Sequence, residues 1–141
     1  MLKNIPKVIS PLLIKTMMEM GHGDEIVLAD GNYPAESAGP MVIRADGLGV
    51  PELLEAILKF FPLDTFVDYN VFLMDNGKAE KPPIWSTYKE ILEKSGEKYS
   101  IKELERFEFY ERAKNAYCII ATSETALYAN IILKKGVVIS K

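Results

Sequence analysis

Short apolar runs of strand length alternate along this chain with segments whose apolar residues recur at helical spacing, and this alternation constrains the fold most. Apolar runs without helical period, bounded by turn-forming residues, are typical of buried strands. The amphipathic segments between them are typical of crossover helices, because parallel strands need a long connection. The alternation therefore predicts an α/β fold with a mostly parallel sheet.

The predicted elements define a three-layer α/β/α sandwich with helices on both faces of the sheet. The six predicted strands cover residues 25–29, 41–45, 71–75, 98–101, 117–122 and 128–135. The predicted helices cover residues 10–21, 51–61, 84–96 and 106–116. The short connection between the last two strands predicts an antiparallel hairpin, so the sheet is mixed.

The length of 141 residues suits one compact domain. Neither a repeat nor a linker interrupts the pattern, and the polar stretch 75–83 is interpreted as a mobile loop. We therefore expect residues 1–141 to form a single domain.

Charge and cysteine content narrow the class of protein. The net charge is −3 and the lysines are scattered, which argues against binding to a nucleic acid or an anionic membrane. No apolar run reaches the length of a signal peptide or a membrane span. The single Cys118 forms no intramolecular disulfide, which suits a reducing cytosol. The sequence predicts a cytoplasmic protein.

His22 is the only histidine and stands between two glycines in the sequence GHGD, after a predicted helix. Histidine has an ordinary pKa near neutrality, and the negative end of a helix dipole favours the imidazolium. The flanking glycines leave space beside the ring. These features suit a proton donor, although a surface histidine in a helix cap has the same pattern.

Asp30 follows a buried strand at the edge where open α/β sheets hold ligands, although a turn aspartate would also fit there. His22 and Asp30 lie at opposite ends of the predicted strand 25–29, roughly 20 Å apart if the chain is extended at about 3.3 Å per residue. If both contact one small ligand, the hypothesis that follows is a site shared between subunits of a homo-oligomer.

Three further polar residues could bind hydroxyl groups. Tyr128 and Asn130 alternate along a predicted strand, which would place both side chains on one face. Arg106 opens a predicted helix and could donate a forked pair of hydrogen bonds, or it could pair with Glu103. Solvent-exposed positions remain the alternative for all three.

The sequence contains no pattern typical of a metal or cofactor site. No calcium loop, histidine-carboxylate metal motif, nucleophile elbow, Walker loop or dinucleotide-binding turn is present. We expect neither a metal nor a cofactor.

The chain resembles the fucose mutarotase and ribose pyranase family over residues 1–138. The resemblance rests on GHGDEI, on Asp30 with Pro34, and on GPMVIRADG, RFEFYERA and YANIILKKGV. VIRADG and RFEFYERA are similar to the fucose branch, and the ribose branch typically has histidine where this chain has Arg106. Some fucose mutarotases carry histidine where this chain has Asn32, so a role for a second histidine does not transfer.

The resemblance implies a cofactor-independent isomerase that interconverts the anomers of L-fucose, with His22 as proton donor. The substrate-binding residues that it implies are Asp30, Arg106, Tyr128, Ala129 and Asn130. Bacterial members form ring-shaped decamers with sites between subunits, and smaller assemblies also occur in the family. The resemblance therefore also implies self-association, with the number of subunits left open, and a monosaccharide as the other partner. A ribose pyranase and a non-catalytic sugar-binding protein remain the alternatives.

Overall fold

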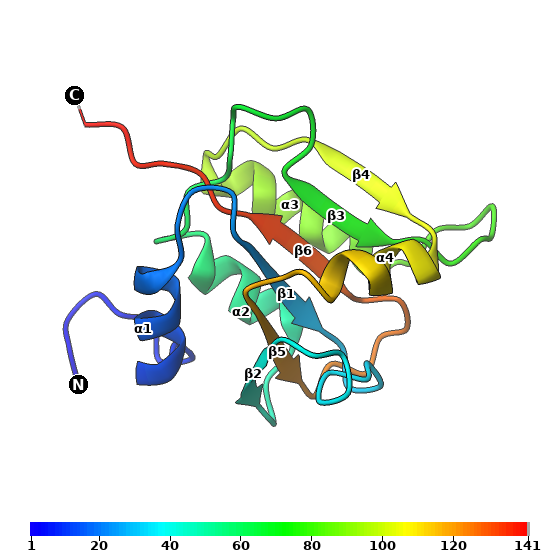
Figure 1. Ribbon diagram of the computed structural model, residues 1–141, viewed down its shortest axis with the longest axis horizontal. Helices are drawn as coiled ribbons and strands as arrows, with labels where there is room; N and C mark the ends of the chain where they lie inside the picture. Colours follow the sequence, from blue (N-terminus) through cyan, green and yellow to red (C-terminus); the bar gives the residue numbers. More distant parts are fainter. Residues whose placement is uncertain (141) are drawn as a thin grey trace.

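The computed structural model describes residues 1–140, which form a mixed sheet covered on both faces (Figure 1). Its strands are β1 (Glu25–Ala29), β2 (Met41–Ala45), β3 (Val71–Met74), β4 (Ile101–Leu104), β5 (Cys118–Thr122) and β6 (Ile131–Lys134). Their order across the sheet is β2-β5-β1-β6-β3-β4. Only β6 pairs antiparallel with its neighbours. The prediction of a mostly parallel, mixed, six-stranded sheet is confirmed.

The helices are α1 (Pro11–Glu19), α2 (Val50–Ile57), α3 (Ile84–Ser95) and α4 (Arg106–Ala113). Within β1, Ile26 and Leu28 face a core shared with α1, α2 and α3, whereas Val27 and Ala29 face a second core beneath α4. Figure 1 shows α4 in front of the sheet, with α2 and α3 behind it. The three-layer sandwich is therefore confirmed. Within residues 1–140, no helix has the length and apolar character needed to cross a bilayer.

The predicted hairpin between the last two strands is wrong. β5 pairs with β1 and β2, whereas β6 lies on the far side of β1 and also pairs with β3. The connecting segment 123–130 carries the chain across the end of β1 instead of turning back tightly. The position of β6 between β1 and β3 leaves it antiparallel, as predicted, but brings the residues that precede β6 next to Asp30.

Gly136 allows the end of the chain to lie directly against the segment that follows α2. Its N–H donates to the carbonyl oxygen of Pro62 over 2.7 Å. A Cβ atom at Gly136 would lie 2.5 Å from the carbonyl oxygen of Leu63 and 2.8 Å from the Cα of Asp64. These distances are too short for any side chain, so the backbone would have to move.

Gly136→Ala is therefore expected to lower the free energy of unfolding by about 1–3 kcal/mol, as overpacking does elsewhere. Chemical denaturation monitored by circular dichroism measures the change. Gly21→Ala is the matched control, because a Cβ at Gly21 meets only Asp24 Oδ2 at an ordinary 3.7 Å. Equal losses in both variants would contradict the close-approach explanation.

Candidate functional site

A pocket opens at the edge of the sheet where β1, β3 and β4 end and β6 begins. Its volume is about 260 Å³. It is lined by Asp30, Asn32, Tyr33, Met74, Arg106, Tyr110, Leu127, Tyr128 and Asn130. The structure thus brings together four of the side chains predicted from the sequence, Asp30 from the connection after β1, Arg106 from the start of α4, and Tyr128 and Asn130 from the connection before β6. Strand ends at this edge commonly position ligand-binding side chains in α/β proteins.

Asp30 is buried and held from several directions. Its Oδ1 accepts the N–H of Asn32 at 3.0 Å, and its Oδ2 accepts the N–H of Ala129 at 3.3 Å. Its own N–H donates to Asn130 Oδ1 at 2.7 Å. Burial raises the pKa of Asp30, although the surrounding hydrogen bonds partly oppose the rise. A fixed carboxylate whose charge is disfavoured by burial is a suitable proton acceptor.

Among residues 1–140, Arg106 is the only cationic residue that lines this pocket. Its guanidinium lies over the ring of Phe107, 4.5 Å from the centroid, and 6.0 Å from that of Tyr110. None of the ion pairs within residues 1–140 involves Arg106, so the alternative pairing with Glu103 is not formed. Its hydrogen-bond donors remain available to a ligand.

Tyr128 and Asn130 share the pocket, but not because they alternate along a strand. β6 begins only at Ile131, and Tyr128 has a φ of 54°, in the left-handed region. The bent backbone brings the N–H of Ala129 to Asp30 and lets the carbonyl of Ala129 accept the hydroxyl of Tyr88 at 2.6 Å. Ala129 is fully buried and supports the pocket wall through its backbone.

Sequence reasoning missed the aromatic part of this pocket. Tyr33 and Tyr110 face each other edge to face with centroids 5.5 Å apart, and both line the pocket. The Tyr33 hydroxyl is buried without a hydrogen-bond partner in the described residues, and burial raises its pKa. The turn sequence after Asp30 carried Tyr33, but nothing in its pattern distinguished a pocket residue from a core residue.

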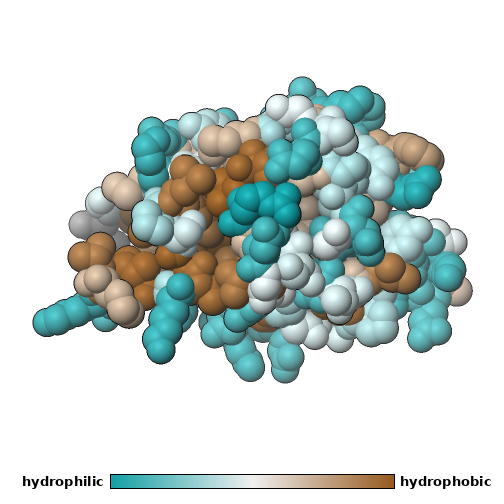
Figure 2. Space-filling model, turned by 90° about the horizontal axis from the view of Figure 1, so that it is seen from below, coloured by the Kyte–Doolittle hydropathy of each residue, from teal (hydrophilic) through white to brown (hydrophobic). Residues whose placement is uncertain are grey.

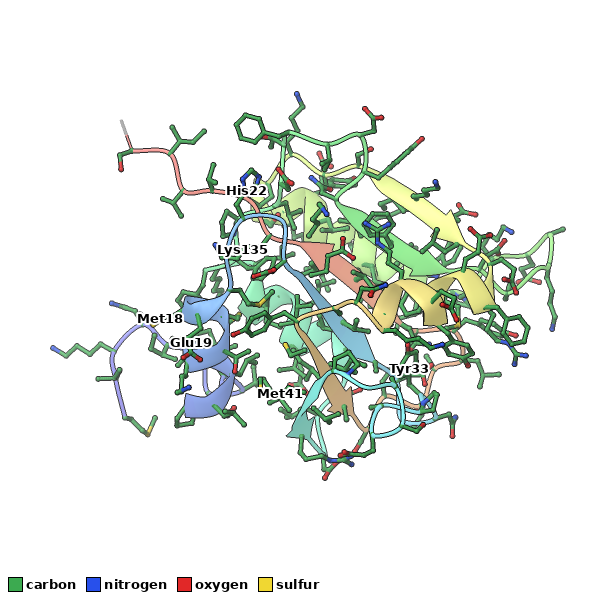
Figure 3. All side chains as sticks on the ribbon, in the orientation of Figure 1. Met18, Glu19, His22, Tyr33, Met41 and Lys135 are labelled. Atoms are coloured by element: carbon green, nitrogen blue, oxygen red, sulfur yellow. The ribbon has the colours of Figure 1, made fainter. Side chains whose placement is uncertain are left out.

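His22 lies at the opposite end of β1 from this pocket. It stands in the connection before β1, whereas Asp30 and Tyr33 follow the strand, and Figure 3 shows His22 and Tyr33 at the two ends. The structure of one chain therefore does not join His22 to the other predicted site residues. α1 ends at Glu19, earlier than predicted, because the chain is extended at Met20. The helix dipole acts mainly within the last turn, so it does not favour the His22 imidazolium in the way that the sequence suggested.

Asp64 is the partner of His22, and sequence analysis did not find it. His22 Nε2 lies 3.0 Å from Asp64 Oδ1. The His22 side chain is 46% exposed, whereas that of Asp64 is 3% exposed. The ring of Phe66 meets the imidazole edge to face, with centroids 5.5 Å apart. A half-exposed imidazole supported by a buried carboxylate is suited to proton transfer.

No metal site accompanies these groups: among residues 1–140, no cluster of three or more His, Cys, Asp or Glu side chains could hold a metal ion. Cys118 is buried in the core, and burial raises its thiol pKa to about 12. The imidazole, carboxylates and polar side chains described above are suited to acid–base catalysis and hydrogen bonding.

Comparison with known proteins assigns the chain to a family. Residues 3–138 match the model of the RbsD / FucU transport protein family. The chain belongs to this family.

Its relatives include the fucose mutarotase of Homo sapiens, 52% identical over 144 residues that cover 96% of this chain and 94% of the relative. Among solved structures, the fucose mutarotase from Streptococcus pneumoniae in complex with L-fucose is 56% identical, with a TM-score of 0.94 and coverage of 98% of this chain and 100% of that one. RbsD from Bacillus subtilis, complexed with D-ribose, is 24% identical with a TM-score of 0.76 over 99% of this chain and 100% of its own, and shares the fold.

Proposed function

We propose that this protein is an L-fucose mutarotase, a cofactor-independent isomerase that interconverts the α and β anomers of L-fucopyranose. The observation that carries the proposal is a pocket with a carboxylate, a guanidinium, an amide and aromatic rings, in a chain 56% identical to a fucose mutarotase bound to L-fucose. These groups match the hydroxyls and the apolar face of a monosaccharide.

The reaction needs only proton transfers. The ring oxygen gains a proton, the anomeric hydroxyl loses one, the ring opens, and it closes after rotation about one carbon–carbon bond. His22 donates the proton to the ring oxygen, and Asp30, directly or through a water molecule, accepts the proton of the anomeric hydroxyl. Proton flow reverses on closure, so neither residue is consumed.

The remaining pocket residues orient the sugar. Arg106 donates to adjacent hydroxyls, and Tyr128 and Asn130 contact the sugar from the segment before β6. Ala129 contributes its backbone, because its N–H holds the Asp30 carboxylate.

The separation of His22 from the pocket supports a site shared between subunits. A neighbouring copy can bring its His22 against the pocket of the first chain, which one chain cannot do alone. Apolar surface gathers near α1 and the N-terminal segment (Figure 2), where eight mostly apolar residues between Met1 and Ile14 line a hollow of about 690 Å³. Exposed apolar surface of this kind is typical of interaction sites.

The assembly that we propose is a ring-shaped homo-oligomer, a decamer, with sites near the interfaces. Each subunit contributes residues 1–141 as a single sugar mutarotase domain, and the protein acts in the cytoplasm without a metal or cofactor.

The protein is expected to accelerate exchange between the anomers of L-fucose at equilibrium. Saturation-difference proton NMR measures this exchange, with D-ribose as the comparison sugar. We expect exchange about tenfold or more faster with L-fucose, because D-ribose lacks its methyl group and differs in configuration at C2, and a pocket distinguishes one methyl group alone by roughly this factor. Faster exchange with D-ribose would favour a ribose pyranase. Binding of L-fucose without exchange would favour a sugar-binding protein.

A further inference from the structure

The Asp64 carboxylate joins two neighbouring groups through a single oxygen. Oδ1 lies 3.0 Å from His22 Nε2 and accepts the N–H of Phe66 at 3.0 Å. Phe66 is 70% exposed although it is a large apolar residue, and its ring packs edge-on against the imidazole. One buried carboxylate therefore sets the orientation of the candidate proton donor and of the aromatic ring beside it.

The segment that carries Asp64 is itself fixed from both sides. The N–H of Asp64 donates to the carbonyl of Lys134 at 3.0 Å, and the buried Asn70 side chain donates to the carbonyl of Asp64 at 3.0 Å. The N–H of Leu63 donates to Glu97 at 2.7 Å. The contact of Gly136 with this segment adds a further restraint. The carboxylate is thus preorganised and cannot easily turn away from the imidazole.

Asp64 is ionised at neutral pH. Burial acts to raise its pKa, but the hydrogen bonds from Phe66 and His22 and the charges of His22 and Lys134 outweigh burial and lower it.

Other charged groups near His22 are already engaged. Lys134 pairs with Glu25 at 3.1 Å, and Lys135 Nζ donates to its neighbouring carbonyl at 3.3 Å. The Asp24 carboxylate accepts the N–H of Gly21 at 2.7 Å. Asp64 is therefore the carboxylate that acts on the imidazole directly.

We infer that Asp64 is the positioning residue for proton transfer: its carboxylate accepts the Nε2–H of His22, so that Nδ1 is the atom that exchanges a proton with the sugar. This inference rests on the proposed function and adds a second carboxylate, distinct from Asp30, with a different task. Asp64 stabilises the imidazolium and fixes the ring, whereas Phe66 closes one side of it against water.

The test is Asp64→Asn, because the amide oxygen can still accept the N–H of Phe66 while the negative charge is lost. We expect kcat for L-fucose exchange to fall about 10- to 100-fold, as for other orienting partners of histidine. KM should stay nearly unchanged.

Asp75→Asn is the matched control. Asp75 does not line the pocket, but its hydrogen bonds resemble those of Asp64. Its Oδ1 accepts the N–H of Gly77, two residues ahead, at 3.2 Å, and also accepts from the ammonium of Lys81 at 2.9 Å. This variant should keep the wild-type kcat. A folded Asp64→Asn variant with an unchanged kcat would overturn the inference.

An NMR measurement on the wild-type protein tests the same inference without any activity. His22 is the only histidine, so its imidazole nitrogens are assigned without ambiguity in ¹⁵N-labelled protein. The neutral ring should be almost wholly the Nε2–H tautomer, and Asp64→Asn should increase the Nδ1–H fraction. A mixture of tautomers in the wild type would overturn the role of Asp64. Absence of exchange with every sugar would instead count against the proposed function alone.

Discussion

His22→Ala is expected to abolish the acceleration of L-fucose anomer exchange, with a fall of at least about 100-fold, because general acid catalysis typically contributes 10²- to 10⁴-fold. No other imidazole exists in the chain to replace it. Saturation-difference NMR measures the loss. The fold should survive, since His22 lies in a connection and its side chain is half exposed.

A second variant separates proton transfer from the hydrogen bond to Asp64. His22→Gln keeps an N–H group that can donate to Asp64, but an amide does not titrate near neutrality. It should be as inactive as His22→Ala while unfolding more like the wild type, because the buried Asp64 keeps a partner. Normal exchange in either folded variant would remove His22 from the mechanism and leave Asp30 as the candidate catalyst.

The layers of the fold could be predicted because they follow from local periodicity. The spacing of apolar residues over a few neighbouring positions distinguishes strand-forming runs, such as residues 25–29 and 117–122, from helical segments. The position of β6 could not be predicted in this way. Its partners β1 and β3 are chosen by contacts across the whole sheet, and the short connection after β5 suggested the nearest partner instead.

For the candidate site, too, local sequence signals could be interpreted and contacts between distant residues could not. The sequence could place Asp30 at this edge of the sheet because it follows a strand, which is a local signal. Asn130 lines the same pocket, but the reason given for it was wrong, because β6 begins only at Ile131. Asp64 was missed because 42 positions separate it from His22, and no spacing in the sequence shows that the end of β6 brings the two together.

If each site is shared between subunits, two variants with impaired anomer exchange should regain part of this activity when they assemble together. Arg106→Ala removes a guanidinium from the pocket lining and should reduce exchange about 10- to 100-fold, as expected when hydrogen bonds from a charged group are lost. Arg106 is exposed and forms no ion pair within residues 1–140, so the fold should be kept. Co-assembly of this variant with His22→Ala should recover about a quarter of wild-type exchange, because a site then receives both native residues in about one case of four.

The matched control is co-assembly of the wild-type chain with the double variant His22→Ala/Arg106→Ala in equal amounts. Sites shared between subunits again give about a quarter of full exchange, whereas sites within one subunit give about half. Exchange rates on co-expressed, doubly tagged oligomers distinguish the two results, and native mass spectrometry of the same samples counts the subunits, for which we expect ten. No recovery in mixtures of the single variants, together with half activity in the control, would place His22 and Arg106 in the same subunit's site. His22 and Arg106 of one chain would then have to contact the same sugar, although they lie at opposite ends of β1. That would require the chain to bend, and the pairing of β1 with β5 and β6 opposes such bending.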